Sequence, residues 1–170
     1  MKRLALSSIC PDVAPCDWCF QNGPHGKPAV AGMECPPHFN ISHTRNVAVC
    51  AVTTAGPVGI DAEPLSRGAD VLRVLDCFTT LEERASITQP EDAVWLWTAK
   101  EALVKASGEG LTGIRRSTTW LPLTRWTINR RYAVTVAASS GARVTPVALL
   151  ATDHLAAAAE PRDASDCWAH

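Results

Sequence analysis

Trp97-Thr98-Ala99-Lys100-Glu101-Ala102-Leu103-Val104-Lys105 is the stretch that decides the fold of this chain. It has the pattern of the middle of a helix, and apolar residues continue the pattern on two faces. Gly108 and Gly110 follow as residues that end helices. The sequence therefore predicts a long, largely buried helix over residues 91–107.

Glu101 is the unusual residue of this predicted helix. At about 100° per residue it falls on one face with Val94, Trp97 and Val104. A carboxylate in an apolar stripe is costly unless a cation lies against it. The sequence leaves two interpretations open, which are a metal or basic partner from elsewhere and a salt bridge to Lys105, four residues on.

A second acidic site lies upstream, where residues 57–63 form a predicted strand that returns antiparallel to the predicted strand 47–54. Alternation in a strand places Asp61 and Glu63 on the same face. Two adjacent carboxylates repel each other, and a divalent cation is a common reason for such a pair. Asp61, Glu63 and Glu101 would suit Mg²⁺, which keeps several waters and often binds substrate phosphate. The alternative is a solvated strand end.

These two motifs together resemble the signature of the 4′-phosphopantetheinyl transferases, in which G-I-D-x-E precedes W-[ST]-x-K-E-A-x-x-K. Further segments resemble motifs of the larger, surfactin-synthetase-activating type of this family. They are Gly26-Lys27-Pro28, Phe39-Asn40-Ile41-Ser42-His43-Thr44 and Thr80-Leu81-Glu82-Glu83. The resemblance covers residues 18–111.

The resemblance implies an α+β fold made of two pseudo-symmetric half-domains with antiparallel sheets and a long helix. Relatives of the larger type have a substantial segment before the G-K-P motif, so the first half is expected to be shortened here. We expect an N-terminal half-domain over residues 1–56 and a C-terminal half-domain over residues 57–155. A disordered tail is expected over residues 156–170, because that segment has low complexity.

The activity implied by the resemblance is Mg²⁺-dependent transfer of 4′-phosphopantetheine from coenzyme A to a serine of an acyl or peptidyl carrier protein, which releases 3′,5′-ADP. The predicted metal ligands are Asp61, Glu63 and Glu101. Glu101 is also the candidate general base, and the candidate phosphate contacts beside it are Lys100 and Lys105.

Lys27, Ser42 and His43 are the other predicted coenzyme contacts. In the family, the lysine of G-K-P reaches the bound coenzyme, and the Ser-His pair contacts its nucleotide part. Hydroxyl, imidazole and backbone N–H groups at a strand end are suitable phosphate donors. Without the resemblance, Lys27 would be a solvated loop lysine and Ser42-His43 a capped turn.

Two other functions stay open. The first is a catalytically silent homologue of the same fold, which the shortened start favours and the intact acidic trio opposes. The second is another metal-dependent phosphodiester enzyme, for which no distinctive motif is present. An arginine-rich segment at residues 113–131 could bind an acidic carrier protein or be a solvated face of the sheet.

Composition gives the remaining expectations for this chain of 170 residues with a net charge of −1. The near-neutral charge argues against binding nucleic acid or an anionic membrane. No apolar run approaches the roughly 18 residues of a membrane span, so a cytoplasmic protein is expected.

Seven cysteines argue against a closed disulfide framework. Early cysteines could bind zinc or stay reduced thiols, and these are Cys10, Cys16, Cys19 and Cys35.

Overall fold

The structure is a computed structural model that describes residues 1–108, 110, 121–139, 142 and 148–150. Its α-helices are α1 (Lys2–Ile9), α2 (Gly68–Arg73), α3 (Leu81–Ala85) and α4 (Pro90–Ser107). Short 3₁₀ helices are η1 (Pro24–Gly26), η2 (Leu65–Arg67) and η3 (Leu75–Cys77). The strands are β1 (Phe20–Asn22), β2 (Pro28–Val30), β3 (His38–Thr44), β4 (Val47–Thr53), β5 (Val58–Pro64), β6 (Leu123–Ile128), β7 (Tyr132–Ala138) and β8 (Ala148–Leu150).

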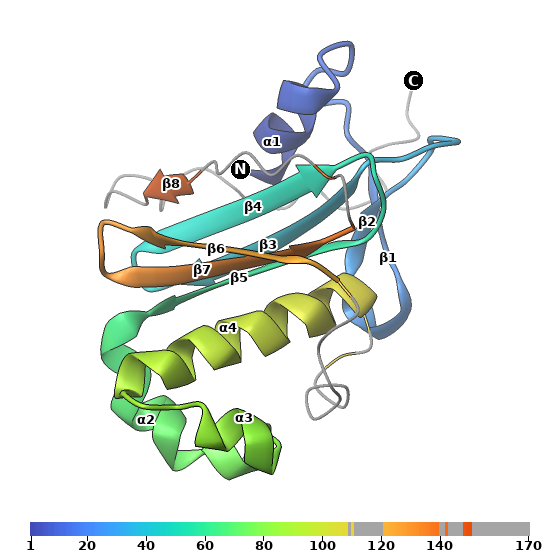
Figure 1. The fold of residues 1–170 in the computed structure, drawn as a ribbon. Helices are drawn as coiled ribbons and strands as arrows, with labels where there is room; N and C mark the ends of the chain where they lie inside the picture. Colours follow the sequence, from blue (N-terminus) through green and yellow to red (C-terminus); the bar gives the residue numbers. More distant parts are fainter. Residues whose placement is uncertain (109, 111–120, 140–141, 143–147, 151–170) are drawn as a thin grey trace.

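The strands form antiparallel sheets that stack in layers between helices (Figure 1). One sheet has the order β3-β4-β8, another has the order β5-β7-β6, and β1 pairs with β2 as a separate hairpin. In Figure 1, α1 lies beyond the first sheet, and α4 runs along the opposite side, against β5 and β7. This arrangement confirms the predicted α+β class with antiparallel sheets and a long helix.

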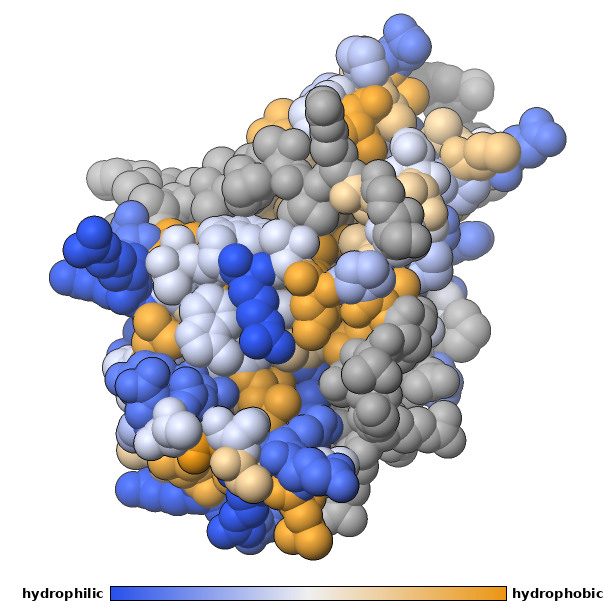
Figure 2. Space-filling model, viewed as in Figure 1, coloured by the Kyte–Doolittle hydropathy of each residue, from blue (hydrophilic) through white to orange (hydrophobic). Residues whose placement is uncertain are grey.

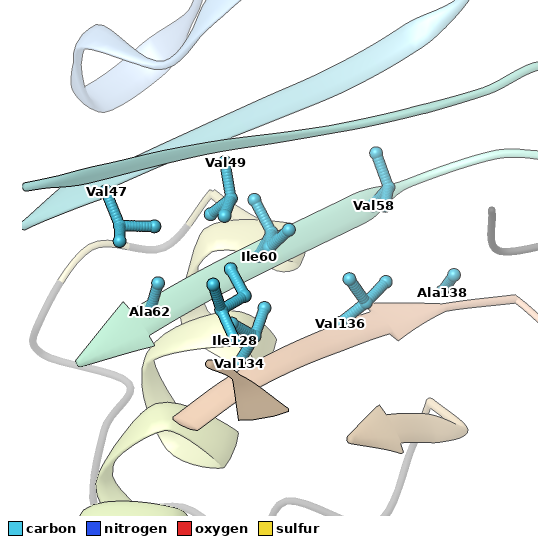
Figure 3. Packing of buried hydrophobic residues seen from close by; sticks show 9 residues of the cluster. All are labelled: Val47, Val49, Val58, Ile60, Ala62, Ile128, Val134, Val136 and Ala138. Carbon is cyan, nitrogen blue, oxygen red and sulfur yellow. The ribbon is translucent and has the colours of Figure 1, made fainter. Parts of the chain in front are cut away.

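The main hydrophobic core lies between the two sheets (Figure 3). Val47 and Val49 on β4 point toward Ile60 and Ala62 on β5. All four side chains are almost completely removed from water, and burial of each valine or isoleucine contributes roughly 1.5–3 kcal/mol to folding. This contact positions the acidic strand, because Asp61 lies between two of the core residues and projects from the opposite face of β5.

Helix α4 begins and ends where the sequence predicts. Gln89 and Asp92 form a reciprocal capping box around Pro90, and Gly108 ends the helix in a left-handed conformation at φ 75°. Much of the surface of α4 is buried, as the two apolar faces of its sequence predict. Small side chains lie where the helix packs most closely against the second sheet, and Ala102 and Ala106 belong to this set.

Gly59 permits an especially close approach of β5 to α4. A Cβ atom added at Gly59 would overlap the carbonyl oxygen of Ala102 and lie 2.5 Å from the backbone nitrogen of Ala106. No residue with a side chain fits there unless the two backbones separate. The glycine of the G-I-D-x-E motif therefore brings the acidic strand into contact with the helix that contains Glu101.

The predicted pairing of the acidic strand with the preceding strand is wrong. β5 pairs with β7 along its whole length, and both edges of β4 are occupied, by β3 and β8. On the other edge of β5, backbone N–H groups donate hydrogen bonds to side chains of β3, and not to the backbone of a neighbouring strand. Asn40 Oδ1 accepts a hydrogen bond from the Ile60 N–H at 2.9 Å, and Ser42 Oγ accepts one from the Ala62 N–H at 3.3 Å.

Other predicted elements show a mixed outcome. The apolar spacing of residues 69–78 predicts one helix, but the structure interrupts it, because α2 ends at Arg73 and η3 follows. The spacing of Thr80 and Glu83 predicts a capping box, and the structure shows it at the start of α3. The β-favouring residues at 126–128 and 132–138 predict strands, which are present as β6 and β7. The apolar run at 144–151 predicts a further strand, most of which lies outside the described residues, as do Trp120 and the tail over 156–170.

The division into half-domains stays a prediction. Its boundary at residue 56 falls in the connection between β4 and β5. The two predicted segments are joined by a sheet, because β8 of the second segment pairs with β4 of the first.

The surface of the described residues is mixed in character (Figure 2). Hydrophobic residues reach the surface at the lower end of this view, where α2 and α3 lie, and Leu72, Val74 and Leu81 of that region are exposed. No helix in the described part of the chain is long and apolar enough to cross a membrane. Within the same residues, no group of three or more His, Cys, Asp or Glu side chains is arranged to hold a metal ion, so the early cysteines form no zinc site there.

Candidate active site

Asp61 is the centre of a buried polar cluster where β3, β5 and α4 meet. Its side chain is almost fully buried, and its Oδ1 atom accepts hydrogen bonds from Ser42 Oγ at 2.8 Å and from Lys105 Nζ at 2.6 Å. Lys105 Nζ also donates to Ser42 Oγ at 3.3 Å. Three residues that are distant in sequence, and were predicted separately, are therefore in direct contact.

The other carboxylate oxygen of Asp61 has no hydrogen-bond partner. Oδ2 is buried and is the unsatisfied side-chain atom among the described residues. A buried carboxylate oxygen without a donor is costly, by about 1–3 kcal/mol or more. This atom is therefore the strongest structural indication that the cluster binds a further donor or a cation.

Glu101 lies close enough to the two acidic residues of β5 to interact with them electrostatically. Burial raises the pKa of Glu101, the charge of Lys105 opposes this rise, and the charges of Asp61 and Glu63 add to it. Within the described residues Glu101 forms no ion pair, because Lys105 pairs with Asp61 instead. The simple salt bridge between Glu101 and Lys105 is therefore not formed, and the carboxylate stays available for a cation.

Glu63 is engaged elsewhere in this structure. Its Oε1 atom pairs with Arg67 Nη1 at 2.6 Å, in a contact at the partly exposed end of β5. The three predicted metal ligands thus interact through space, but they do not form a closed ligand set in the described structure. Mg²⁺ does not require such a set, because it commonly uses one or two carboxylates together with waters and substrate phosphate.

A pocket of about 230 Å³ opens beside this cluster. Glu101, Val104 and Lys105 form its wall on α4, and Gly26-Lys27-Pro28 forms the opposite wall. The pocket therefore brings the G-K-P loop and the K-E-A-x-x-K helix to one cavity, as the family resemblance implies. Its size and its charged groups suit part of a phosphate-containing ligand.

Lys27 has structural contacts in addition to its place in this pocket. Its ammonium donates to the carbonyl oxygens of Ala106 at 3.0 Å and Val58 at 3.4 Å. Burial lowers the pKa of Lys27. These hydrogen bonds connect the G-K-P loop to the last turn of α4 and to the start of β5. Lys27 is therefore not a freely solvated loop lysine.

Ser42 and His43 lie on opposite faces of β3. Ser42 is buried within the Asp61 cluster, whereas His43 is exposed, and neither is among the residues that line the pocket. Alternation of side chains along the strand causes this separation. The structure therefore brings Ser42 to the site, and it does not bring His43 there.

Lys100 also lies apart from the pocket. Its side chain has no solvent exposure, and Nζ pairs with Glu83 Oε1 at 2.9 Å. The other carboxylate oxygen of Glu83 accepts the capping hydrogen bond from the Thr80 N–H. Lys100 thus joins α4 to the start of α3, which differs from its predicted role at the phosphate.

Asn40 and His25 are pocket residues that the sequence did not single out. Asn40 lines the pocket and orients β5 through its bond to Ile60. His25 also lines the pocket, from a backbone with φ 61° in η1. The alternation of Asn40 and Ser42 with the apolar Phe39 and Ile41 in β3 could have indicated the first of these. No comparable sequence signal points to His25.

Lys100→Met tests the structural role of the buried lysine. We expect this variant to lose roughly 1–3 kcal/mol of unfolding free energy, because Glu83 would lose its cation while remaining partly buried. Coenzyme A affinity should stay within about twofold of the parent. Urea unfolding and calorimetric titration measure the two quantities, with Lys105→Met as the matched lysine variant. Weaker coenzyme binding with unchanged stability would restore Lys100 as a coenzyme contact.

Comparison with known families identifies the family of this chain. A sequence model described as the 4′-phosphopantetheinyl transferase superfamily matches residues 57–159, which include β5, α4 and β7. The match covers more than half of the chain. The chain therefore belongs to the 4′-phosphopantetheinyl transferase superfamily.

Curated relatives have the same family name. The chain is 31% identical over 121 residues to the Synechocystis protein slr0495, provisionally named a 4′-phosphopantetheinyl transferase, with 65% of this chain and 49% of that protein covered. It is 31% identical over 121 residues to the transferase gsp of Aneurinibacillus migulanus, with 69% and 46% covered. It is 30% identical over 102 residues to the transferase Sfp of Bacillus subtilis, with 55% and 42% covered. The chain thus spans about half the length of these relatives.

Proposed function

We propose that this protein transfers the 4′-phosphopantetheine group of coenzyme A to a serine of an acyl or peptidyl carrier protein and releases 3′,5′-ADP. The observation that supports this most strongly is the meeting of Asp61, Glu101 and Lys105 beside a pocket whose opposite wall is the G-K-P loop. Family membership supports the same reaction.

Mg²⁺ is the cation that the donor set fits best. Within the described residues, Asp61 Oδ2 has no hydrogen-bond partner and the Glu101 carboxylate forms no ion pair. Both are hard oxygen donors at the same cluster. Glu63 would join them by exchanging its contact with Arg67. When bound, Mg²⁺ would supply charge neutralisation at the pyrophosphate and at the leaving 3′,5′-ADP.

The chain's own residues account for the other requirements of the reaction. In transfer, the carrier serine oxygen forms a bond to the phosphorus of the phosphopantetheine group. The bond from this phosphorus to the 3′,5′-ADP oxygen breaks, and the electron pair leaves with 3′,5′-ADP. Lys105, on the pocket wall, would bind the transferring phosphate.

Glu101 is the proposed acceptor of the serine proton, directly or through a water. Burial raises the pKa of Glu101, which favours proton acceptance, whereas a bound Mg²⁺ would oppose this rise. Lys27 and Pro28 would hold the coenzyme against the opposite wall of the pocket. The nucleophile belongs to the carrier protein, so this chain needs no activated serine or cysteine of its own.

The proposed partners are coenzyme A and a carrier protein, with no role for nucleic acid or membrane, and the proposed location is the cytoplasm. Arg125, Arg130 and Arg131 are exposed on β6 and the turn that follows it, and they could contact an acidic carrier. The other arginines of the predicted basic segment, Arg115 and Arg116, lie outside the described residues.

Intact-mass analysis of an apo carrier protein tests the proposed reaction. After incubation with the protein, coenzyme A and Mg²⁺, the carrier should gain the mass of one 4′-phosphopantetheine group. Substitution of the carrier serine by alanine should prevent the gain. Cleaved coenzyme without an adduct would instead indicate another phosphodiester enzyme, and unchanged coenzyme and carrier would indicate a silent homologue.

A further inference from the structure

A second pocket, of about 300 Å³, lies on the other side of Lys27 from the candidate active site. The two pockets share Lys27, Pro28 and Gly108, so these residues form the wall between them. The second pocket is bounded mainly by apolar side chains of β2, β3 and the segments beside them, among them Val30, Phe39 and Pro57. Neither the family resemblance nor the proposed reaction assigns it a ligand.

Lys27 and His38 are the titratable side chains at this pocket. Burial lowers the pKa of Lys27, and burial together with the charge of Lys27 lowers the pKa of His38. The described residues that line the pocket include no aspartate or glutamate. The cationic forms of these two groups therefore lack a compensating negative charge, which an anionic ligand would supply.

The ammonium of Lys27 has capacity for another acceptor. It has three N–H donors, and the carbonyl oxygens of Ala106 and Val58 accept two of them. His38 is exposed at the start of β3, and its imidazole can donate one further hydrogen bond. Donors at one end and an apolar surface at the other fit a ligand with an anionic head and an apolar body.

We propose that the second pocket binds a small amphipathic carboxylate, whose head contacts Lys27 and His38 and whose apolar body lies against Val30 and Phe39. The pocket volume corresponds to roughly ten non-hydrogen atoms, at about 30 Å³ for each water-sized unit. A medium-chain fatty acid such as octanoate has this size. The proposal does not rest on the transfer reaction. Because Lys27 and Pro28 also line the proposed coenzyme pocket, octanoate binding is measured without coenzyme A.

Titrations of the wild-type protein with ligands of one chain length test the requirement for a negative charge. Octanoate should bind at least about tenfold more tightly than octanamide, which has the same apolar body and no charge. Nuclear magnetic resonance should show shifts of the Val30 and Phe39 side-chain signals as octanoate is added. Equal affinity for the two ligands, or no octanoate binding at millimolar concentration, would overturn the proposal.

Variants then locate the site. Lys27→Met and His38→Phe should each weaken octanoate binding about tenfold, whereas Lys105→Met, the same charge change in the first pocket, should leave it within twofold. An equal loss in Lys105→Met would place the anion outside the second pocket and overturn the assignment. Coenzyme A that displaces octanoate and shifts the same Val30 and Phe39 signals would also overturn it, because the pocket would then be part of the coenzyme site.

Discussion

Asp61→Asn is expected to lower the rate of carrier modification by at least about two orders of magnitude while the protein stays folded. The asparagine side chain has the same size and can still accept the hydrogen bond from Ser42. It lacks the negative charge that pairs with Lys105 at 2.6 Å and the anionic oxygen that we assign to the cation. Steady-state kinetics with an apo carrier protein measures the change.

Asp70→Asn is the matched control for this substitution. Asp70 lies on α2, and its exposed carboxylate forms a surface pair with Arg73 at 3.3 Å. Such pairs contribute about 0–1 kcal/mol, so activity and stability should stay near those of the parent. Activity of Asp61→Asn within a few-fold of the parent would exclude Asp61 from the proposed chemistry.

Gly59→Ala is expected to have the largest effect on stability, with a loss of roughly 3 kcal/mol or more of unfolding free energy. The added methyl group would overlap the Ala102 carbonyl oxygen and lie 2.5 Å from the Ala106 nitrogen. Since these are backbone atoms, β5 and α4 would have to separate. Denaturant unfolding measures the loss, and carrier modification should decrease because the separation also removes Asp61 from Lys105.

A second substitution distinguishes a backbone clash from a side-chain clash. Ala102→Gly removes the side chain of the residue whose backbone meets Gly59 but leaves its carbonyl oxygen in place. The double variant Gly59→Ala with Ala102→Gly should therefore be no more stable than Gly59→Ala alone. A recovery of most of the lost stability in the double variant would show that the close approach does not involve the backbone.

The sequence predicted those parts of the site that depend on spacing within one element. Helix α4 could be delimited from its periodicity and from Gly108, and alternation placed Asp61 and Glu63 on one face of a strand. A carboxylate within an apolar stripe singled out Glu101, which the structure places on the pocket wall, where burial raises its pKa. The family motifs added the G-K-P loop, which the structure places across the pocket.

The errors arose where the partner of a residue comes from another element. Lys100 and Lys105 are both lysines near Glu101 in the sequence, but only the packing of α3 shows that Lys100 pairs with Glu83. The position of β5 beside β7, rather than β4, depends on side chains of β3 that satisfy its free edge. Spacing along the chain contains no information about either contact.

The central claim is that the carboxylates at the contact between β5 and α4 hold one divalent cation. Paramagnetic Mn²⁺ substitutes for Mg²⁺, and electron paramagnetic resonance counts the bound ions in the presence of coenzyme A. The account predicts one site in the parent and in Asp70→Asn, and at least about tenfold weaker binding in Asp61→Asn. Mn²⁺ binding of equal strength in Asp61→Asn and the parent would contradict it.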